Sequence, residues 1–315
     1  MIAFVFPGQG AQKVGMGKAL TEAFPICRDT FDEADAALGA PLSTLCFEGP
    51  DQQLLLTENT QPAILAMSIA VWRLVESRGV RAAFAAGHSL GEYSAHVAAG
   101  TLSFADALRT VRVRGKYMQE AVPVGEGAMA AILGLDEYGV TRACAETMAE
   151  LPGRVVTAAN LNAPGQVVIA GHADAVARAG ERAKALGARR AIALNVSAPF
   201  HCPLMKPAED RLAPELKALA ASDPAIPVVA NVDGQPKRDA RSSIDALIRQ
   251  VSSPVRWEDV VKRLVADGAR TFVELGPGSV LAGLIKKIDR SVAVMSIEDG
   301  AGLDAALTQL QQTDS

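Results

Sequence analysis

The chain has 315 residues, of which 49% are hydrophobic, 21% charged and 4% aromatic. This composition is typical of a globular protein and excludes a disordered chain, and the length allows one large domain or two unequal ones. The formal net charge is −4 at pH 7 and no basic stripe runs through the sequence, which excludes nucleic acid as the main partner.

The four cysteines, Cys27, Cys46, Cys144 and Cys202, lie far apart and form no C-x-x-C pair. Their spacing indicates neither a zinc site nor a disulfide framework, so a reducing compartment is expected. No stretch reaches the roughly 20 apolar residues that span a bilayer, and the apolar run 1–6 is too short for a signal peptide. We therefore expect a cytoplasmic protein with no metal site and no membrane partner.

The N-terminal part of the chain predicts strands that alternate with helices. The run IAFVF, residues 2–6, predicts a strand, and a glycine turn and helix-like sequence to about Ala37 follow it. A second helix is expected from about Gln61 to Arg78, where apolar residues recur with a period near 3.6, and it precedes a short strand. Such repeated β-then-α units predict an α/β-hydrolase-like domain with a mostly parallel sheet covered by helices.

Between residues 127 and 196 the pattern changes. Strands are predicted at 128–135, 154–160, 166–171 and 189–196, and helices at 136–150 and 174–186. This βαββαβ order is the ferredoxin-like arrangement. We therefore predict an inserted subdomain at 127–196 and a large α/β catalytic domain made of 1–126 and 197–315, in which another strand, turn and helix start at Thr271.

Residues 84–96 read FAAGHSLGEYSAH, in which Gly87 and Gly91 each lie two positions from Ser89. The pattern G-x-S-x-G is typical of a sharp turn between a strand and a helix, where glycines avoid backbone collisions and the serine hydroxyl is exposed. The N–H groups at the start of such a helix favour negative charge on a substrate oxygen. Ser89 is therefore a candidate nucleophile, although the same residues also suit a glycine-bounded turn in which Ser89 is a helix N-cap.

A serine nucleophile needs a base within hydrogen-bond reach. The chain has four histidines, His88, His96, His172 and His201. The first two lie in the same turn and helix as Ser89, where we expect their rings to be badly placed for its hydroxyl, and His172 is expected in a structural role near a helix cap. His201 lies between Pro199 and Pro203, in a rigid loop that is a good mount for a base, although a single loop histidine is more often structural.

A buried arginine is predicted on the helix that starts near Phe104. Apolar residues at 107, 108, 111 and 118 form a stripe that requires a member at 114 or 115, where Arg114 and Gly115 stand. A buried guanidinium is unfavourable unless an anion meets it. That anion can be an internal Asp or Glu, or a substrate carboxylate that the guanidinium holds with two parallel hydrogen bonds.

The glycine-rich segment FPGQGAQKVGMGKA, residues 6–19, does not match the nucleotide-binding motifs. A dinucleotide fingerprint from Gly8 needs a small residue where Lys13 stands, and a P-loop from Gly10 needs a lysine where Met16 stands. We instead expect the backbone and Gln9 to approach a ligand at the carboxyl edge of the sheet.

Seven segments form a joint pattern, which in chain order is FPGQGAQ, GHSLGEY, RGKYMQ, NAPGQVVIAG, SAPFHCPLM, VSSPVRW and ELGPGSVL. In order and spacing this pattern resembles the malonyl-CoA:acyl carrier protein transacylases of fatty acid synthesis, over nearly the whole chain. The resemblance implies a cofactor-independent acyltransferase. It would move malonyl from malonyl-CoA to the phosphopantetheine thiol of acyl carrier protein, through a malonyl-serine intermediate and with ping-pong kinetics.

The resemblance also implies residue roles. It matches Ser89 to the acyl-accepting serine, His201 to its base, Arg114 to the arginine that binds the malonyl carboxylate, Gln9 and the Leu90 N–H to the oxyanion hole, and Gln250 to the residue whose backbone carbonyl orients the histidine. In this family that carbonyl replaces the carboxylate of the hydrolase triad. Phe200 resembles the form associated with malonyl rather than methylmalonyl units.

Three alternatives stay open. A serine esterase or thioesterase would share the serine turn and the histidine, but the buried arginine and the inserted subdomain favour transfer. A transacylase of a polyketide or malonate decarboxylase system would use the same chemistry. A non-catalytic docking module is disfavoured because the matched site residues are intact.

Since carrier proteins of this pathway are acidic, docking would need a local basic patch. The candidates are Arg189, Arg190, Lys286, Lys287 and Arg290.

Overall fold

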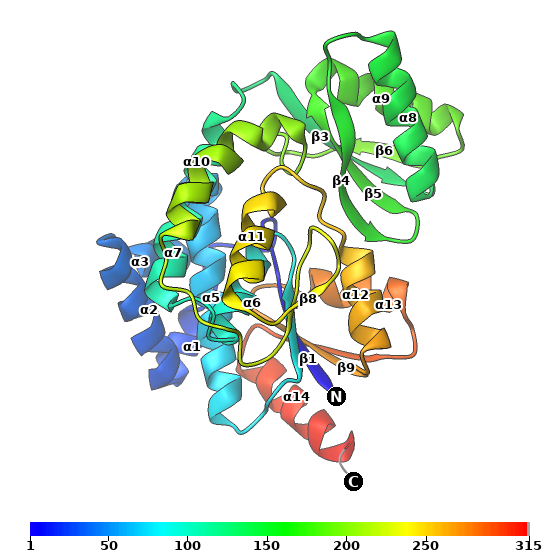
Figure 1. Cartoon of the computed structure of the whole chain (residues 1–315). Helices are drawn as coiled ribbons and strands as arrows, with labels where there is room; N and C mark the ends of the chain where they lie inside the picture. Colours follow the sequence, from blue (N-terminus) through cyan, green and yellow to red (C-terminus); the bar gives the residue numbers. More distant parts are fainter. Residues whose placement is uncertain (314–315) are drawn as a thin grey trace.

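The computed structural model describes residues 1–313 and contains two β-sheets (Figure 1). The larger sheet has six strands in the order β10-β9-β1-β2-β7-β8. These strands are β1 (Ile2–Phe6), β2 (Phe84–Gly87), β7 (Val228–Val229), β8 (Pro236–Lys237), β9 (Thr271–Leu275) and β10 (Ala293–Ile297). All neighbouring strands pair in parallel except β8, which is antiparallel to β7. The predicted parallel sheet is confirmed, with β8 as an antiparallel edge.

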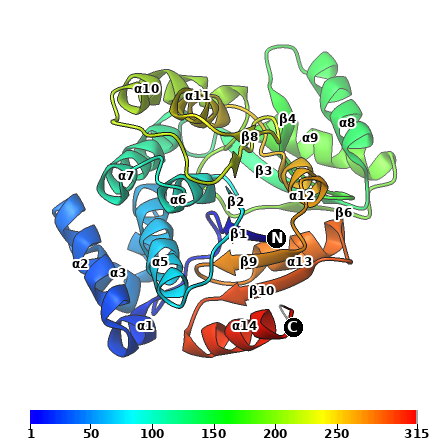
Figure 2. The ribbon, with the colours of Figure 1, turned by 60° about the horizontal axis from the view of Figure 1, so that its bottom comes forward.

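Helices cover both faces of this sheet because the side chains of its strands alternate between two cores. Along β1, Phe4 and Phe6 belong to one core, and Ala3 and Val5 belong to the other. The first core packs against α1 (Lys18–Ala23), α2 (Pro25–Leu38), α3 (Leu42–Glu48), α4 (Asp51–Leu54), α5 (Thr57–Ser77), α6 (Leu90–Ala98), α7 (Phe104–Glu120), α10 (Lys206–Lys217), α11 (Ala240–Gln250) and α14 (Gly300–Thr313). The second packs against α12 (Trp257–Ala266) and α13 (Val280–Ile288). Figure 2 shows α5 and α6 on one side of the row of strands and α12 and α13 on the other.

Two predicted helix boundaries differ from the structure. The helix expected from about Gln61 begins at Thr57, and Pro62 lies inside it. Proline removes one backbone hydrogen bond there, but the buried face of α5 extends across it, so packing outweighs the lost bond. The single helix expected up to Ala37 is divided between α1 and α2 at Phe24, which is extended because a proline follows it.

The smaller sheet is antiparallel, with the strand order β4-β5-β3-β6. Its elements are β3 (Gly127–Leu133), α8 (Glu137–Glu150), β4 (Val156–Ala163), β5 (Gln166–His172), α9 (Ala173–Ala185) and β6 (Arg190–Ala193). Both helices share a hydrophobic core with this sheet, apart from the rest of the chain (Figure 1). The predicted ferredoxin-like order is confirmed, and the domain boundaries at 127 and 196 stay a prediction.

The end of β4 joins the small sheet to the rest of the molecule. Leu161 N–H donates to the carbonyl of Val255 over 2.9 Å, and Val255 N–H donates to the carbonyl of Ala159 over 2.8 Å. Just beyond these bonds, Asn162 of β4 contacts His88, which directly follows β2. The carboxyl edge of an open α/β sheet is where such folds bind ligands.

Candidate active site

Ser89 lies in the turn between β2 and α6 with an unusual backbone conformation, φ 52° and ψ −106°. A Cβ atom added to Gly87 would lie 1.9 Å from the carbonyl carbon of Gly91, and one added to Gly91 would lie 2.0 Å from the carbonyl oxygen of Phe6. Side chains therefore do not fit at either glycine. Ser89 occupies the N-cap position of α6, but its hydroxyl makes no capping hydrogen bond. The turn leaves this hydroxyl free to contact other groups.

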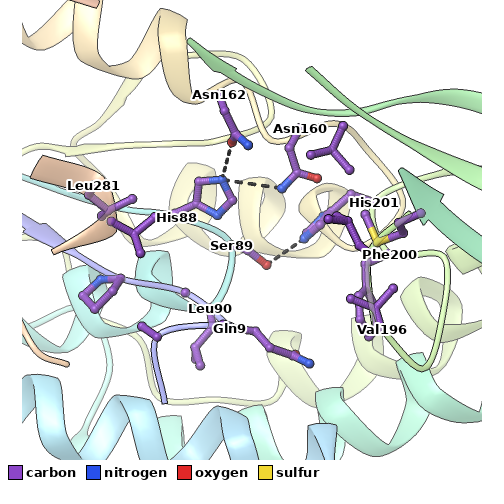
Figure 3. A pocket seen from close by; sticks show the side chains of 18 of the residues that line it. Gln9, His88, Ser89, Leu90, Asn160, Asn162, Val196, Phe200, His201 and Leu281 are labelled. Atoms are coloured by element: carbon purple, nitrogen blue, oxygen red, sulfur yellow. Dashed lines mark hydrogen bonds between the residues drawn. The ribbon is translucent and has the colours of Figure 1, made fainter. Parts of the chain in front are cut away.

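The Ser89 hydroxyl lies 2.7 Å from Nε2 of His201 (Figure 3). Nδ1 of His201 lies 3.0 Å from the main-chain carbonyl oxygen of Gln250. Since a carbonyl only accepts hydrogen bonds, Nδ1 carries the proton, and the lone pair of Nε2 faces the hydroxyl. Burial, with the nearby charge of Arg114, lowers the pKa of His201 to about 3. The imidazole is therefore neutral at pH 7 and able to accept the Ser89 proton.

The other histidines lie where their rings do not contact Ser89. Nε2 of His88 lies 2.9 Å from Oδ1 of Asn162 on β4 (Figure 3). His96 is fully buried in α6, and neither ring nitrogen has a hydrogen-bond partner in the described part of the chain. His172 is the N-cap residue of α9, as expected, and its Nδ1 accepts from the N–H of Val155 over 2.9 Å.

Arg114 is 1% exposed, which confirms the burial predicted from the stripe of α7. Its Nη1 donates to Oε1 of Gln61 over 2.8 Å, and its Nη2 donates to Oγ of Ser89 over 3.1 Å and to Oε1 of Gln250 over 2.9 Å. Its Nε–H has no partner, and within residues 1–313 no Asp or Glu forms an ion pair with it. No internal carboxylate contacts this guanidinium directly; the charge of Glu92 acts on it only from beyond the Gln250 side chain, so the guanidinium is suited to an incoming anion.

A cavity of about 300 Å³ opens above Ser89. Its apolar lining comes from Leu90, Met118, Met129, Val168, Leu194, Val196, Phe200, Val280, Leu281 and Leu284, and its polar lining from Gln9, Gln61, His88, Asn160, Asn162, Gln166 and the Ser89, His201 and Arg114 side chains. Strands β3, β4 and β5 of the small sheet contribute residues, and so do the segments that follow β1 and β2, so the cavity lies between the small sheet and the carboxyl edge of the large one. Such apolar walls with a few convergent polar groups are typical of a small-molecule binding site.

Gln9 and Leu90 lie on the side of Ser89 opposite His88 in Figure 3. Gln9 follows β1, is exposed and lines the cavity. Leu90 is the first residue of α6, and the N–H groups of a first helical turn have no partner within the helix. Both residues therefore line the same cavity as Ser89, and their role as an oxyanion hole stays a prediction.

The structure also brings together three buried polar residues that the sequence analysis did not single out. Gln61 contacts Arg114; Asn231 accepts the N–H of Ser89 on Oδ1 over 2.7 Å; and Glu92 accepts from both Asn231 and Gln250. The sequence feature that could have identified them is the one that identified Arg114, namely a polar residue among apolar neighbours. Asn231 follows the strand sequence PVVA, and Glu92 lies in the first turn of the helix after Ser89.

Comparison with known proteins decides the family. A family model described as an acyl transferase domain matches residues 3–309. The chain belongs to the acyl transferase family. It is 52% identical over 308 residues, 98% of this chain and 99% of the relative, to a malonyl CoA-acyl carrier protein transacylase of Salmonella typhimurium. It is 49% identical over 311 residues to the protein of the same description from Bacillus subtilis, covering 99% of this chain and 98% of the relative.

Solved acyl transferase structures share the fold. An acyl carrier protein S-malonyltransferase from Vibrio cholerae is 48% identical with a TM-score of 0.94, covering 97% of this chain and 99% of that one. A malonyl-transacylase solved in complex with a type II polyketide acyl carrier protein is also 48% identical, with a TM-score of 0.94, covering 98% and 99% of the two chains.

In residues 1–313 of this acyl transferase, no group of three or more His, Cys, Asp or Glu residues could hold a metal ion, and no helix is long and apolar enough to cross a membrane.

Proposed function

We propose that this acyl transferase moves the malonyl group from malonyl-CoA to the phosphopantetheine thiol of acyl carrier protein, through a malonyl ester on Ser89, and so supplies fatty acid elongation. One observation supports this most strongly: the Ser89 hydroxyl lies between Nε2 of His201 and Nη2 of Arg114. The proposed nucleophile thus contacts both the proposed base and the cation that we assign to the malonyl carboxylate. The relatives described as malonyl transacylases agree with this function.

In the first half-reaction, Nε2 of His201 takes the proton of the Ser89 hydroxyl, and Oγ attacks the carbonyl carbon of the malonyl thioester. The tetrahedral oxyanion is held by Gln9 and by the main-chain N–H of Leu90. When the intermediate collapses, the C–S bond breaks, and His201 returns the proton to the coenzyme A sulfur. The backbone carbonyl of Gln250 keeps the imidazole in the required tautomer throughout.

In the second half-reaction, the phosphopantetheine thiol of the carrier protein enters the vacated cavity. His201 takes the thiol proton, the sulfur attacks the malonyl ester, and the proton passes to Oγ as the C–O bond breaks. The products are malonyl carrier protein and free Ser89, so no cofactor is needed and the kinetics are ping-pong. The substrates are malonyl-CoA and the carrier protein, with no nucleic acid and no membrane as partners.

Substrate selection is assigned to Arg114. A malonyl thioester supplies a carboxylate for its guanidinium, whereas an acetyl thioester would leave the charge buried and unpaired. Because breaking a buried ion pair costs about 3–5 kcal/mol, discrimination on the order of a hundredfold to a few thousandfold is expected. Phe200 is 8% exposed and lines the cavity, which supports a preference for malonyl over the bulkier methylmalonyl group.

We assign carrier-protein docking to the basic residues predicted from the sequence, one of which, Lys287, contacts the cavity lining. Lys287 donates to Oε1 of Gln166, a residue that lines the cavity, over 2.9 Å. The predicted residues, Arg189, Arg190, Lys286, Lys287 and Arg290, are all exposed, and none of them forms an ion pair with a residue of the described chain. They are therefore available to an acidic partner.

A cytoplasmic location remains part of the proposal and is supported by the four free cysteines.

The test is intact-protein mass spectrometry after brief mixing with malonyl-CoA or acetyl-CoA, followed by a chase with holo acyl carrier protein. We expect a malonyl adduct on the wild-type protein and none on Ser89→Ala, and the adduct should pass to the carrier protein faster than to water. Loss to water at the same rate with and without carrier protein would favour a thioesterase. Because one 48% identical neighbour was solved with a type II polyketide carrier protein, chases with fatty acid and polyketide carrier proteins should be compared.

A further inference from the structure

Glu92 is a fully buried carboxylate that the mechanism above does not use. It lies in the first turn of α6, three residues after Ser89, and is 0% exposed. Its Oε2 accepts the main-chain N–H of Asn231 over 3.0 Å and Nε2 of Gln250 over 2.8 Å, whereas Oε1 has no partner among the described residues. Burial raises the pKa of this carboxyl to about 7, so its burial is unfavourable and calls for a compensating role.

The contacts of the Gln250 side chain show what Glu92 does. Nε2 of Gln250 faces two acceptors, the carbonyl oxygen of Ser89 at 2.9 Å and Oε2 of Glu92. Oε1 of Gln250 faces a donor, Nη2 of Arg114, at 2.9 Å. A flipped amide would place its oxygen against two acceptors and its NH₂ group against a donor. Glu92 therefore helps to select the one amide orientation in which Gln250 accepts from Arg114.

A second set of bonds connects Glu92 to the nucleophile itself. The N–H of Asn231 is held by Glu92, and Oδ1 of Asn231 accepts the N–H of Ser89 over 2.7 Å. On the other side of the serine, its carbonyl accepts from Gln250. The strained backbone of Ser89 is thus held at both its N–H and its C=O by residues that Glu92 contacts.

We infer that Glu92 is a positioning residue, which acts through the Gln250 amide to hold the Arg114 guanidinium in its malonyl-binding orientation. This inference rests on the proposed function, because it deepens the role given there to Arg114. Glu92 does not touch the acyl group. Its effect is expected in the preference for malonyl over acetyl thioesters, which depends on Arg114, and a purely structural role would lower both reactions together.

The test compares three variants of the full chain by their rates of serine acylation from malonyl-CoA and acetyl-CoA. In Glu92→Gln the amide oxygen can still accept both hydrogen bonds, so we expect the malonyl preference to stay within about threefold of wild type. In Glu92→Leu both acceptor bonds are lost. We expect malonyl acylation to fall by about tenfold to a hundredfold. Acetyl acylation should fall less, because it depends on the Ser89 backbone contacts but not on the orientation of Arg114. Glu274→Leu is the matched control.

Glu274 is also 0% exposed, and its carboxylate accepts N–H bonds from Leu281 and Ala282 rather than contacting Gln250 or Arg114. Its replacement should leave the malonyl preference unchanged. A double-mutant cycle completes the test: in a Gln250→Leu background, which keeps the backbone carbonyl, Glu92→Leu should have no further effect on that preference. If Glu92→Leu melts far below wild type, Glu92→Met replaces it, since methionine has a similar length.

The two hypotheses fail in different ways. If the wild-type protein takes no malonyl from malonyl-CoA, the proposed function is wrong. If the wild type is malonylated but Glu92→Leu keeps the full malonyl preference, or loses both acyl reactions equally, the positioning role is wrong and the proposed function stands. Additive effects in the double-mutant cycle would likewise overturn the route through Gln250.

Discussion

Arg114 donates a hydrogen bond from Nη2 to the Oγ atom of Ser89 over 3.1 Å. The cation that we assign to the malonyl carboxylate therefore also contacts the hydroxyl that we propose as nucleophile. A positive charge at this distance, in a site where Arg114 is 1% exposed, favours negative charge on the serine oxygen. Substrate binding and activation of the nucleophile are thus coupled through one side chain.

Replacing Arg114 should change substrate choice more than it changes stability. In Arg114→Gln the carboxylate loses its cation, so we expect the malonyl acylation rate constant kcat/KM to fall on the order of a hundredfold to a few thousandfold. Acetyl acylation should also fall, because Ser89 loses the nearby positive charge, but by much less than malonyl acylation. Rapid-quench mass spectrometry with both thioesters measures the ratio of the malonyl to the acetyl acylation rate.

The matched control for that variant is Arg112→Gln. Arg112 lies on the same helix, is only partly buried and does not line the cavity. It should leave both acylation rates within about twofold of wild type. Equal losses for malonyl-CoA and acetyl-CoA in Arg114→Gln would contradict the assignment of the carboxylate to this guanidinium.

His96 should make the protein sensitive to acid. Burial lowers its pKa from 6.5 to about 3, so in the window between these values the unfolded chain binds a proton that the folded chain does not. Above pH 6.5 His96 is neutral in both states and stability is unaffected. Below pH 6.5 the free energy of unfolding decreases by about 1.4 kcal/mol per pH unit, because only the unfolded chain gains the proton. His96→Leu removes this one group, so its free energy of unfolding should fall less steeply between pH 6.5 and 4.5.

Urea denaturation of both proteins at pH 7.5, 5.5 and 4.5 measures the difference. Relative to wild type, the free energy of unfolding of His96→Leu should rise by about 2–3 kcal/mol from pH 7.5 to 4.5. His88 and His201 remain in both proteins, so their shared acid sensitivity cancels. A gap that stays constant with pH would show that His96 is not held neutral.

Gly91→Ala should disrupt the turn that presents Ser89. The new Cβ would lie 2.0 Å from the carbonyl oxygen of Phe6, so β1 and α6 would have to separate. We expect a loss of several kcal/mol in stability and loss of serine acylation. Gly283→Ala is the control, because its Cβ meets nothing within 4 Å on an exposed part of α13, and alanine there should raise stability by about 0.5–1 kcal/mol. Thermal melts and the malonyl-adduct assay distinguish the two glycines.

Reversing Lys286 and Lys287 to glutamate should weaken the second half-reaction alone. We expect the KM for acyl carrier protein to rise about tenfold or more, since an acidic partner would meet two negative charges, while acylation by malonyl-CoA stays unchanged. Rising salt should reduce the difference between variant and wild type. Lys18→Glu with Lys217→Glu makes the same change of charge at exposed positions outside the cavity lining. An unchanged KM in the first variant would remove these lysines from the docking surface.

Local sequence was enough to predict the elements on which the site stands. The glycine spacing around Ser89 allows few backbone shapes, and the period of α7 predicts Arg114 on its buried face, because both signals depend on residues close in sequence. The βαββαβ order was readable for the same reason. The early start of α5 was not, since Pro62 inside a helix is decided by packing with the rest of the core.

Sequence by itself thus determined the α/β class, the ferredoxin-like order, the serine turn and the burial of Arg114, because these follow from local pattern and from the cost of burying charge. Only the tertiary structure decided which groups meet. Ser89, Glu92, Arg114, Asn231 and Gln250 come from four separate segments of the chain, and their hydrogen bonds link residues up to 161 positions apart. Sequence spacing does not encode such distances. They are set by the parallel sheet, which brings the carboxyl ends of β2 and β7 together, and by the helices packed against that edge.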